Sequence, residues 1–342
     1  MNFFCECQEA AACRTAVIYS GRHSQRLEIA MRFVGSDEIR RTLTFPILVA
    51  AMEASHRGRR MEINDMLMGE EKALYFARSA ADHGRAFGSK VFTSFPGNLT
   101  AGKGLPAVQA VYVLFSGTDG RSLAVLDGTE ITWWKTAADS ALGAKLLAPA
   151  LPETLVVVGA GAIAPWLARA HLSVRPSIRR VLVWNRTSER AETVARGLRD
   201  EGIAAVATAD LEVAVRQADV VTSVTRSHVP LIKGAWLRTG THLNLVGGYS
   251  PETREADDEA ARRARIFVDR RESAFHGVGD ILQPIASGAI RKEDVLGDLY
   301  DLIGGALPGR RAADDITLFK NAGGGHLDLM TAQAIMAQLG AA

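Results

Sequence analysis

A glycine-rich segment near the middle of the chain has the residue types and spacing of a nucleotide-binding turn. It follows the pattern G-x-G-x-x-A and consists of Gly159, Ala160, Gly161, Ala162, Ile163 and Ala164. The first glycine allows a tight turn, the second leaves room for a pyrophosphate, and the alanine lets a helix pack closely on a strand. Free N–H groups at the start of that helix then bind the phosphates. We therefore predict a dinucleotide site; the alternative is a tight turn that binds no ligand.

The residues around this segment supply the context that the motif needs. An apolar run at 155–158 predicts a buried parallel strand, 165–172 a helix and 181–184 a second buried strand. Together they form a strand–helix–strand unit of the usual size.

The residues after that second strand distinguish between two nicotinamide cofactors. An NAD site normally has an aspartate or glutamate there, which binds the ribose hydroxyls. This chain instead has Asn185, Arg186 and Thr187, with Arg190 further on. A guanidinium suits a 2′-phosphate, and no carboxylate at the strand end repels it. The sequence favours NADPH, with NADH as the alternative.

Composition and charge narrow the functional class. The chain has 342 residues, of which 47% are hydrophobic, and a formal net charge of +2. This balance is not typical of proteins that bind nucleic acid or a membrane surface. We expect a cytoplasmic protein, because no apolar run has the length of a membrane span and the first residues lack the pattern of a signal peptide.

The cysteines do not predict a metal site. Cys5, Cys7 and Cys13 are the only ones, and His23 is the only histidine near them. Structural zinc requires four ligands. We expect reduced thiols and no metal in this protein.

The first part of the chain predicts a mixture of helices and antiparallel strands. Residues 1–30 are expected to be loosely held, and a helix is predicted from Ser36 or Asp37 that restarts at Pro46. The elements expected after it are a strand at 59–68, a helix at 70–83, strands at 89–94, 110–115 and 122–126, a strand at 130–134 after a hairpin turn, and a helix at 136–147.

The second part predicts an α/β fold with a doubly wound parallel sheet. Strands are expected at 204–207, 220–224, 243–246 and 266–268, with a helix at 211–217. Such alternation is typical of a Rossmann-type domain. The tail from 316 onward is expected to add no strand to this sheet, and a helix at 327–339 is expected to return to the first domain.

Many short segments between residues 31 and 342 resemble the ornithine cyclodeaminase/μ-crystallin family. They are 88–91 with 95–98, 126–128 followed by 131–138, 159–164, 218–221, 240–244 with 246–247, 279–280, and 308–310 through 317–320. The resemblance implies a substrate-binding and dimerisation domain (31–135 with 318–342), a dinucleotide-binding domain (136–317) and a homodimer. Thr222, Val224, Val246 and Lys320 lie in or beside matching segments, and we predict that they also contact the cofactor.

The resemblance further implies a small-molecule substrate with an α-amino or α-imino carboxylate, which a basic trio holds. The matching positions are Arg60, which adjoins Arg59, together with Lys90 and Lys135. Fixed cations suit a desolvated carboxylate. The family usually has arginine at the position of Lys135, so a point charge replaces a bidentate group here. Without the family match, Lys90 has the alternative role of a solubilising lysine on an edge strand.

A second departure from the family pattern bears on the reaction. Cyclodeaminases have a catalytic aspartate in a Val-Gly-Ala-Asp segment, whereas this chain has Tyr249 at that position. A phenol is essentially unionised at neutral pH and cannot replace the carboxylate. Ketimine-reducing relatives also lack the aspartate. We therefore predict NAD(P)H-dependent reduction of a cyclic ketimine carboxylate to proline or pipecolate, with a lysine or a water held by Tyr249 as the proton donor.

Three alternatives remain open from the sequence. The chain could be a true ornithine cyclodeaminase, an acyclic amino-acid or opine-type dehydrogenase, or a dinucleotide-binding protein without turnover. The retained basic positions oppose the last of these.

Overall fold

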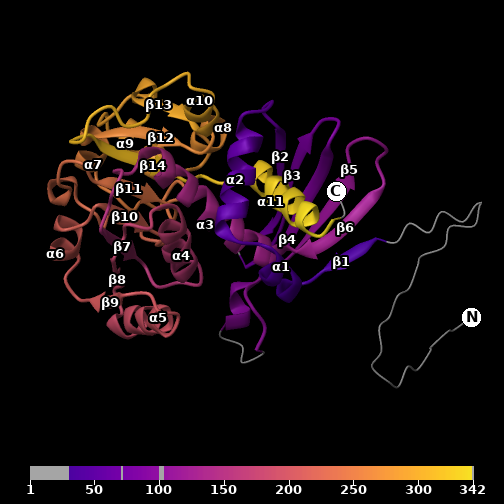
Figure 1. Ribbon diagram of the computed structural model, residues 1–342, viewed down its shortest axis with the longest axis horizontal. Coiled ribbons are helices and arrows are strands. Elements are labelled where there is room, and N and C mark those ends of the chain that lie inside the picture. The colour runs from indigo at the N-terminus through magenta and orange to yellow at the C-terminus, as the bar shows by residue number, and fades with distance from the viewer. Residues whose placement is uncertain (1–30, 71, 100–103, 341–342) are drawn as a thin grey trace, which may run out of the picture.

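The computed structural model describes residues 31–70, 72–99 and 104–340, which form two α/β domains that lie side by side (Figure 1). The predicted leader (1–30) and the three cysteines fall outside these ranges. The predicted fold class is confirmed: one domain mixes helices with a largely antiparallel sheet, and the other has a Rossmann-type parallel sheet.

The first domain is built on a six-stranded sheet with the order β1-β6-β5-β4-β3-β2. Its strands are β1 (Arg32–Val34), β2 (Glu62–Glu70), β3 (Ala73–Asp82), β4 (Ala86–Ser94), β5 (Val108–Ser116) and β6 (Ser122–Asp127). All neighbouring pairs are antiparallel except β1 with β6. The helices of this domain are α1 (Ser36–Thr42), α2 (Phe45–His56) and the C-terminal α11 (Gly325–Gln338), and a 3₁₀ turn, η1 (Pro96–Leu99), follows β4.

The second domain has an eight-stranded, fully parallel sheet with the order β13-β12-β14-β11-β10-β7-β8-β9. The strands are β7 (Thr154–Val158), β8 (Arg180–Trp184), β9 (Ala205–Thr208), β10 (Val220–Ser223), β11 (His242–Leu245), β12 (Ala264–Val268), β13 (Val295–Asp298) and β14 (Ile316–Lys320). The helices are α3 (Gly128–Leu147), α4 (Ala164–Val174), α5 (Ser188–Asp200), α6 (Leu211–Arg216), α7 (Asp258–Arg263), α8 (Arg271–Ala274), α9 (Gly279–Ala286) and α10 (Leu299–Ile303), with 3₁₀ turns η2 (Gly234–Trp236) and η3 (Lys292–Asp294). No helix in the described ranges combines the length and the apolar composition that crossing a membrane requires.

Two predictions for the first domain are wrong. The segment predicted as a helix at 70–83 is the strand β3, which pairs along its whole length with β2 and β4. The segment predicted as a strand at 130–134 belongs to α3, because Asp127 does not form a hairpin turn. Its carboxylate instead accepts a hydrogen bond from the Glu130 N–H at 2.9 Å and caps the helix.

The prediction that the tail adds no strand is also wrong. β14 lies in the interior of the large sheet, between β11 and β12, and β13 forms an edge that was not predicted. The predicted domain boundaries at 135/136 and 317/318 consequently fall inside α3 and β14. α11 packs against α2, α3 and the six-stranded sheet, as expected (Figure 1). The chain therefore passes between the domains at α3 and again after β14.

Candidate functional site

The glycine-rich turn lies at the carboxyl end of β7 and has the geometry of a phosphate-binding loop. Gly159 has a φ of +109°, and a Cβ there would lie 2.7 Å from the Val224 carbonyl oxygen, so a side chain does not fit. A Cβ at Gly161 would meet nothing within 4 Å, so space is open beside the turn. α4 begins at Ala164 and directs its free N–H groups toward this end of the sheet. These residues fit a pyrophosphate.

The polar residues after β8 are available to a ligand. Arg186 and Arg190 are exposed, and within the described ranges neither guanidinium makes a hydrogen bond or an ion pair. Asn185 is oriented by a bond from its side-chain N–H to the Thr187 carbonyl oxygen at 3.0 Å. The first acidic residue after the strand is Glu189, inside α5. Two unpaired cations and no carboxylate at the strand end suit a phosphorylated ribose.

The other predicted cofactor residues lie at the same edge of the sheet, but two of them are engaged by protein groups. Val224 and Val246 directly follow β10 and β11. Thr222 is fully buried and accepts a hydrogen bond from the Asn244 amide at 2.7 Å. Lys320 is fully buried and pairs with Asp280 at 2.9 Å. For Thr222 and Lys320, a contact with the cofactor stays a prediction.

A buried carboxylate that the sequence analysis missed ties these loops together. One oxygen of Glu255 accepts hydrogen bonds from the Ser223 hydroxyl at 2.5 Å and from the N–H and hydroxyl of Thr225 at 2.6 and 2.9 Å. The other oxygen accepts from the N–H groups of Val246 at 3.0 Å and Gly247 at 2.5 Å. Burial and the nearby Asp280 raise the pKa of Glu255, against the effect of these donors. No local motif marks this position in the sequence, because its partners come from two separate loops.

Lys90 and Lys135 come together between the two domains. The Lys90 ammonium is almost fully buried and donates to Asp328 at 2.8 Å and to the Thr132 hydroxyl at 3.1 Å. Burial lowers the pKa of Lys90 to about 8, although Asp328 opposes this effect. Lys135, from α3, is also buried, yet its ammonium makes no hydrogen bond or ion pair within the described part of the chain. It points toward Gly323, where a Cβ would lie 3.2 Å from its Nζ.

The third cation at this place is Arg78, and the sequence analysis did not identify it. Arg78 stands opposite Lys90 in the β3–β4 register, and its guanidinium also approaches Gly323. Asp65 of β2 binds it at 2.6 Å. The false helix prediction at 70–83 hid this pairing, because only a strand places residue 78 beside residue 90.

Arg60 is engaged elsewhere. Its guanidinium binds both oxygens of Asp298, at 2.6 and 2.9 Å, and lies over the Tyr300 ring at 4.5 Å from the centroid. These contacts tie the first domain to the end of β13. A role for Arg60 in binding substrate stays a prediction, and the cation that accompanies the two lysines is Arg78.

Three buried acids surround the ammonium groups. Burial by itself raises the pKa of Asp328, but the positive charges of Lys90 and Lys135 oppose this effect and the pKa lies below its ordinary value. Asp328 is therefore ionised. Asp269, directly after β12, accepts hydrogen bonds from the N–H groups of Gly323 at 2.5 Å and Arg270 at 2.7 Å, yet burial raises its pKa to about 6. Asp139 is fully buried on α3. The site therefore contains both cations and proton-holding acids.

Tyr249 lies in the glycine-containing loop after β11. Its side chain is 54% exposed, and within the described residues its phenol has no hydrogen-bond partner. Besides Glu255, which binds the Val246 and Gly247 N–H groups, a second acid borders this loop, because a Cβ at Gly248 would lie 2.2 Å from the Asp280 carboxylate. The Asp280 carboxylate already accepts hydrogen bonds from the Lys320 ammonium and from the Glu255 N–H. The described loop thus offers no free carboxylate at the position that a cyclodeaminase requires.

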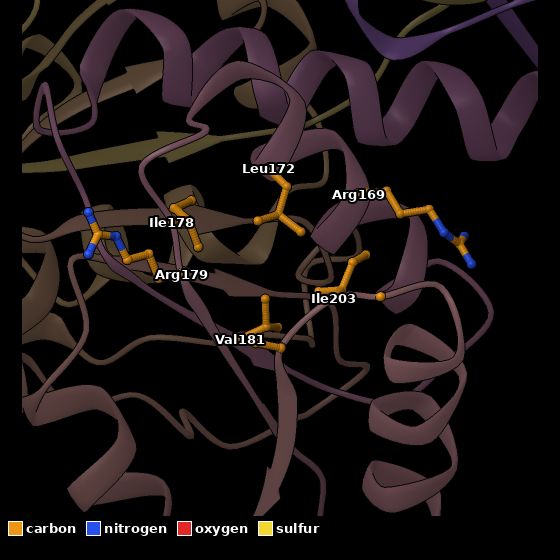
Figure 2. A pocket seen from close by; sticks show the side chains of 8 residues that line it. Arg169, Leu172, Ile178, Arg179, Val181 and Ile203 are labelled. Atoms are coloured by element: carbon orange, nitrogen blue, oxygen red, sulfur yellow. The ribbon is translucent and has the colours of Figure 1, made fainter.

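A cavity of about 550 Å³ lies away from these residues, at the amino ends of β8 and β9 (Figure 2). It is lined mainly by apolar side chains, with Arg169 and Arg179 at its margins (Figure 2). Ligands of parallel α/β sheets bind outside the carboxyl ends of the strands, so this cavity is not the candidate site. The described residues also contain no group of three histidine, cysteine or acidic side chains that could hold a metal ion.

Comparisons with known proteins agree with this geometry. Residues 36–341 match the model of the ornithine cyclodeaminase/mu-crystallin family. The chain is 44% identical over 312 residues to the Delta(1)-pyrroline-2-carboxylate reductase of Paracoccus denitrificans, covering 91% of this chain and 98% of that protein. Its fold is similar to that of the Thermococcus litoralis Delta(1)-pyrroline-2-carboxylate reductase solved with NADH and L-proline, with a TM-score of 0.83, 26% identity and coverage of 90% and 97%. An archaeal alanine dehydrogenase dimer with bound NAD gives a TM-score of 0.83 at 29% identity, with coverage of 90% and 95%.

Proposed function

This chain belongs to the ornithine cyclodeaminase/mu-crystallin family, and we propose from this that it is a nicotinamide-dependent reductase of a cyclic ketimine carboxylate. The substrate would be 1-pyrroline-2-carboxylate or 1-piperideine-2-carboxylate, and the product proline or pipecolate. Two observations carry the proposal: a buried cluster of cations, in which Lys135 is unpaired within the described ranges, and a loop after β11 that holds Tyr249 in place of a free carboxylate. Such a site can bind the carboxylate of an imino acid but lacks the base that deamination needs.

Each part of the site has a distinct task in this reaction. The Lys135 ammonium binds the substrate carboxylate, while Lys90 and Arg78, neutralised in part by Asp328 and Asp65, keep the surroundings positive. The loops after β10 and β11, which Glu255 fixes, would hold the nicotinamide. When bound, the nicotinamide supplies the hydride. A lysine or a water held by Tyr249 supplies the proton.

NADPH is the proposed cofactor in preference to NADH. Arg186 and Arg190 are the groups that would bind the 2′-phosphate, and both guanidinium groups are free of partners in the described ranges. The relatives solved with NADH or NAD support a nicotinamide cofactor in general.

A homodimer is part of the proposal. The edge strand β2 carries Met66, Leu67 and Met68, which are 47%, 61% and 50% exposed, and β5 adds the exposed Val108 and Val111. Exposed apolar side chains on an unpaired edge favour association, and the similar archaeal protein is a dimer. We also propose a cytoplasmic location, because cysteines stay reduced there.

The decisive experiment follows the loss of NADPH with each candidate substrate. We expect oxidation of NADPH with 1-pyrroline-2-carboxylate or 1-piperideine-2-carboxylate, and no release of ammonia from ornithine with added NAD. Ammonia release would identify a cyclodeaminase instead. Oxidation only with pyruvate and ammonium would identify an acyclic amino-acid dehydrogenase, and either result would overturn the proposal.

A further inference from the structure

A buried acid without a hydrogen-bond partner lies one helical turn beyond Lys135. Asp139 is fully buried on α3, and neither carboxylate oxygen makes a hydrogen bond to a described residue. An ionised carboxylate without partners is strongly disfavoured in a protein interior. Burial and the charge of Asp269 raise the pKa of Asp139 well above its ordinary value. The protonated form of Asp139 is therefore favoured.

The second acid of the pair is Asp269, and its hydrogen bonds stabilise the ionised form. Both oxygens of Asp269 act as hydrogen-bond acceptors, one from the Gly323 N–H and the other from the Arg270 N–H. The two acids thus hold one proton, because like charges that lie close together do not both ionise.

The charged groups around the pair come from four elements. Lys135, on the helix of Asp139, faces both acids, and Arg78 of β3 faces Asp269. Lys90 of β4 and Asp328 of α11 face Lys135 in turn. His326 of α11 is fully buried and stays neutral, because burial and the neighbouring cations lower its pKa well below the usual value. Among these groups, Lys135 is the one whose ammonium is free to approach a substrate, and it lies one turn from Asp139.

We propose that Asp139 and Asp269 hold a proton reserve behind Lys135, which replaces the proton that the substrate nitrogen takes up. This inference rests on the proposed function. A bound nicotinamide would supply the hydride for the C–H bond at the imine carbon and be oxidised in doing so. The substrate nitrogen takes its proton from Lys135, whose N–H bond breaks. The O–H bond of Asp139 then breaks and restores the ammonium. Solvent reprotonates the acid pair before the next turnover.

The activity test compares Asp139→Asn with Ser140→Ala over a range of pH. Asparagine keeps the shape but carries no acidic proton, so we expect kcat to fall by about 10²-fold. We also expect the wild-type kcat to decline at rising pH and the variant to lack that decline. Ser140 contacts Asn321 from the same helical turn, at 3.1 Å, so its variant tests whether disturbed packing alone moves the pH profile. An unchanged profile in Asp139→Asn, or an equal change in Ser140→Ala, overturns the proposal.

A second measurement does not require turnover. Asp139 binds its proton more tightly in the folded protein, so its contribution to stability is complete below the ordinary pKa of aspartate and is lost as pH rises through the raised pKa. We expect the Tm of the wild type to fall more between pH 5 and pH 8 than that of Asp139→Asn. Equal falls would show that the acid holds no proton, whatever the enzyme reduces. A different result is also informative: the wild type reduces no imine, but the Tm difference is present. Asp139 then holds a proton, but the proposed function is wrong and no imine reduction uses that proton.

Discussion

Replacing Glu255 by glutamine tests whether one buried carboxylate positions both loops of the cofactor site. The glutamine amide has the same shape, but its NH₂ group donates where the carboxylate accepts. If that group faces the Val246 and Gly247 N–H groups, two buried donors lose their acceptor. Each such loss costs about 1–3 kcal/mol, so the free energy of unfolding should fall by about 2–6 kcal/mol. This is a large part of the roughly 5–15 kcal/mol that is typical of a domain.

The assay combines denaturant unfolding with a cofactor titration. Glu252→Gln is the matched control, since Glu252 is exposed in the same loop and makes no bond to a described residue. We expect Glu255→Gln to unfold at lower denaturant and to bind NADPH more weakly, with Glu252→Gln unchanged in both. A Glu255→Gln protein with wild-type stability would show that the Val246 and Gly247 N–H groups do not depend on this carboxylate as their acceptor. Lower stability with unchanged NADPH affinity would show that these loops do not border the cofactor.

Three further substitutions test the remaining assignments. Arg186→Ala should weaken NADPH binding about tenfold or more while affecting NADH little, because a charge-assisted phosphate contact contributes about 1.5–3 kcal/mol; equal losses in the two titrations would argue against a 2′-phosphate site. Lys135→Met should raise the imine KM and lower kcat/KM without changing NADPH affinity, and an unchanged kcat/KM would place the carboxylate elsewhere. Tyr249→Phe should leave kcat nearly unchanged, because the phenol is exposed and its hydroxyl lacks a partner in the described ranges; a fall of about 10²-fold would assign the proton transfer to Tyr249.

The elements around the glycine-rich turn were predictable because local sequence determines them. β7 and β8 are strands of a parallel sheet, in which burial on both faces requires a continuous apolar run, and their bounds lie within a residue of the prediction. β3 lacks such a signal, since alanine, serine and arginine alternate weakly along it and its state depends on pairing with β2 and β4. β14 is short and apolar, and only its insertion between β11 and β12 identifies it as a central strand.

The candidate site shows the same division between local and long-range information. The motif residues and the lysines lie in segments that the sequence marks, whereas Arg78 becomes a neighbour of Lys90 only through the strand register. The wrong strand prediction at 130–134 also hid the relation between Asp139 and Lys135. Once Asp127 is recognised as a helix cap, α3 extends from Gly128 and places Asp139 one turn from Lys135 on the same face. The buried acid and the free ammonium then belong to one arrangement, and the cap of α3 is what aligns a proton source with the group that binds the substrate.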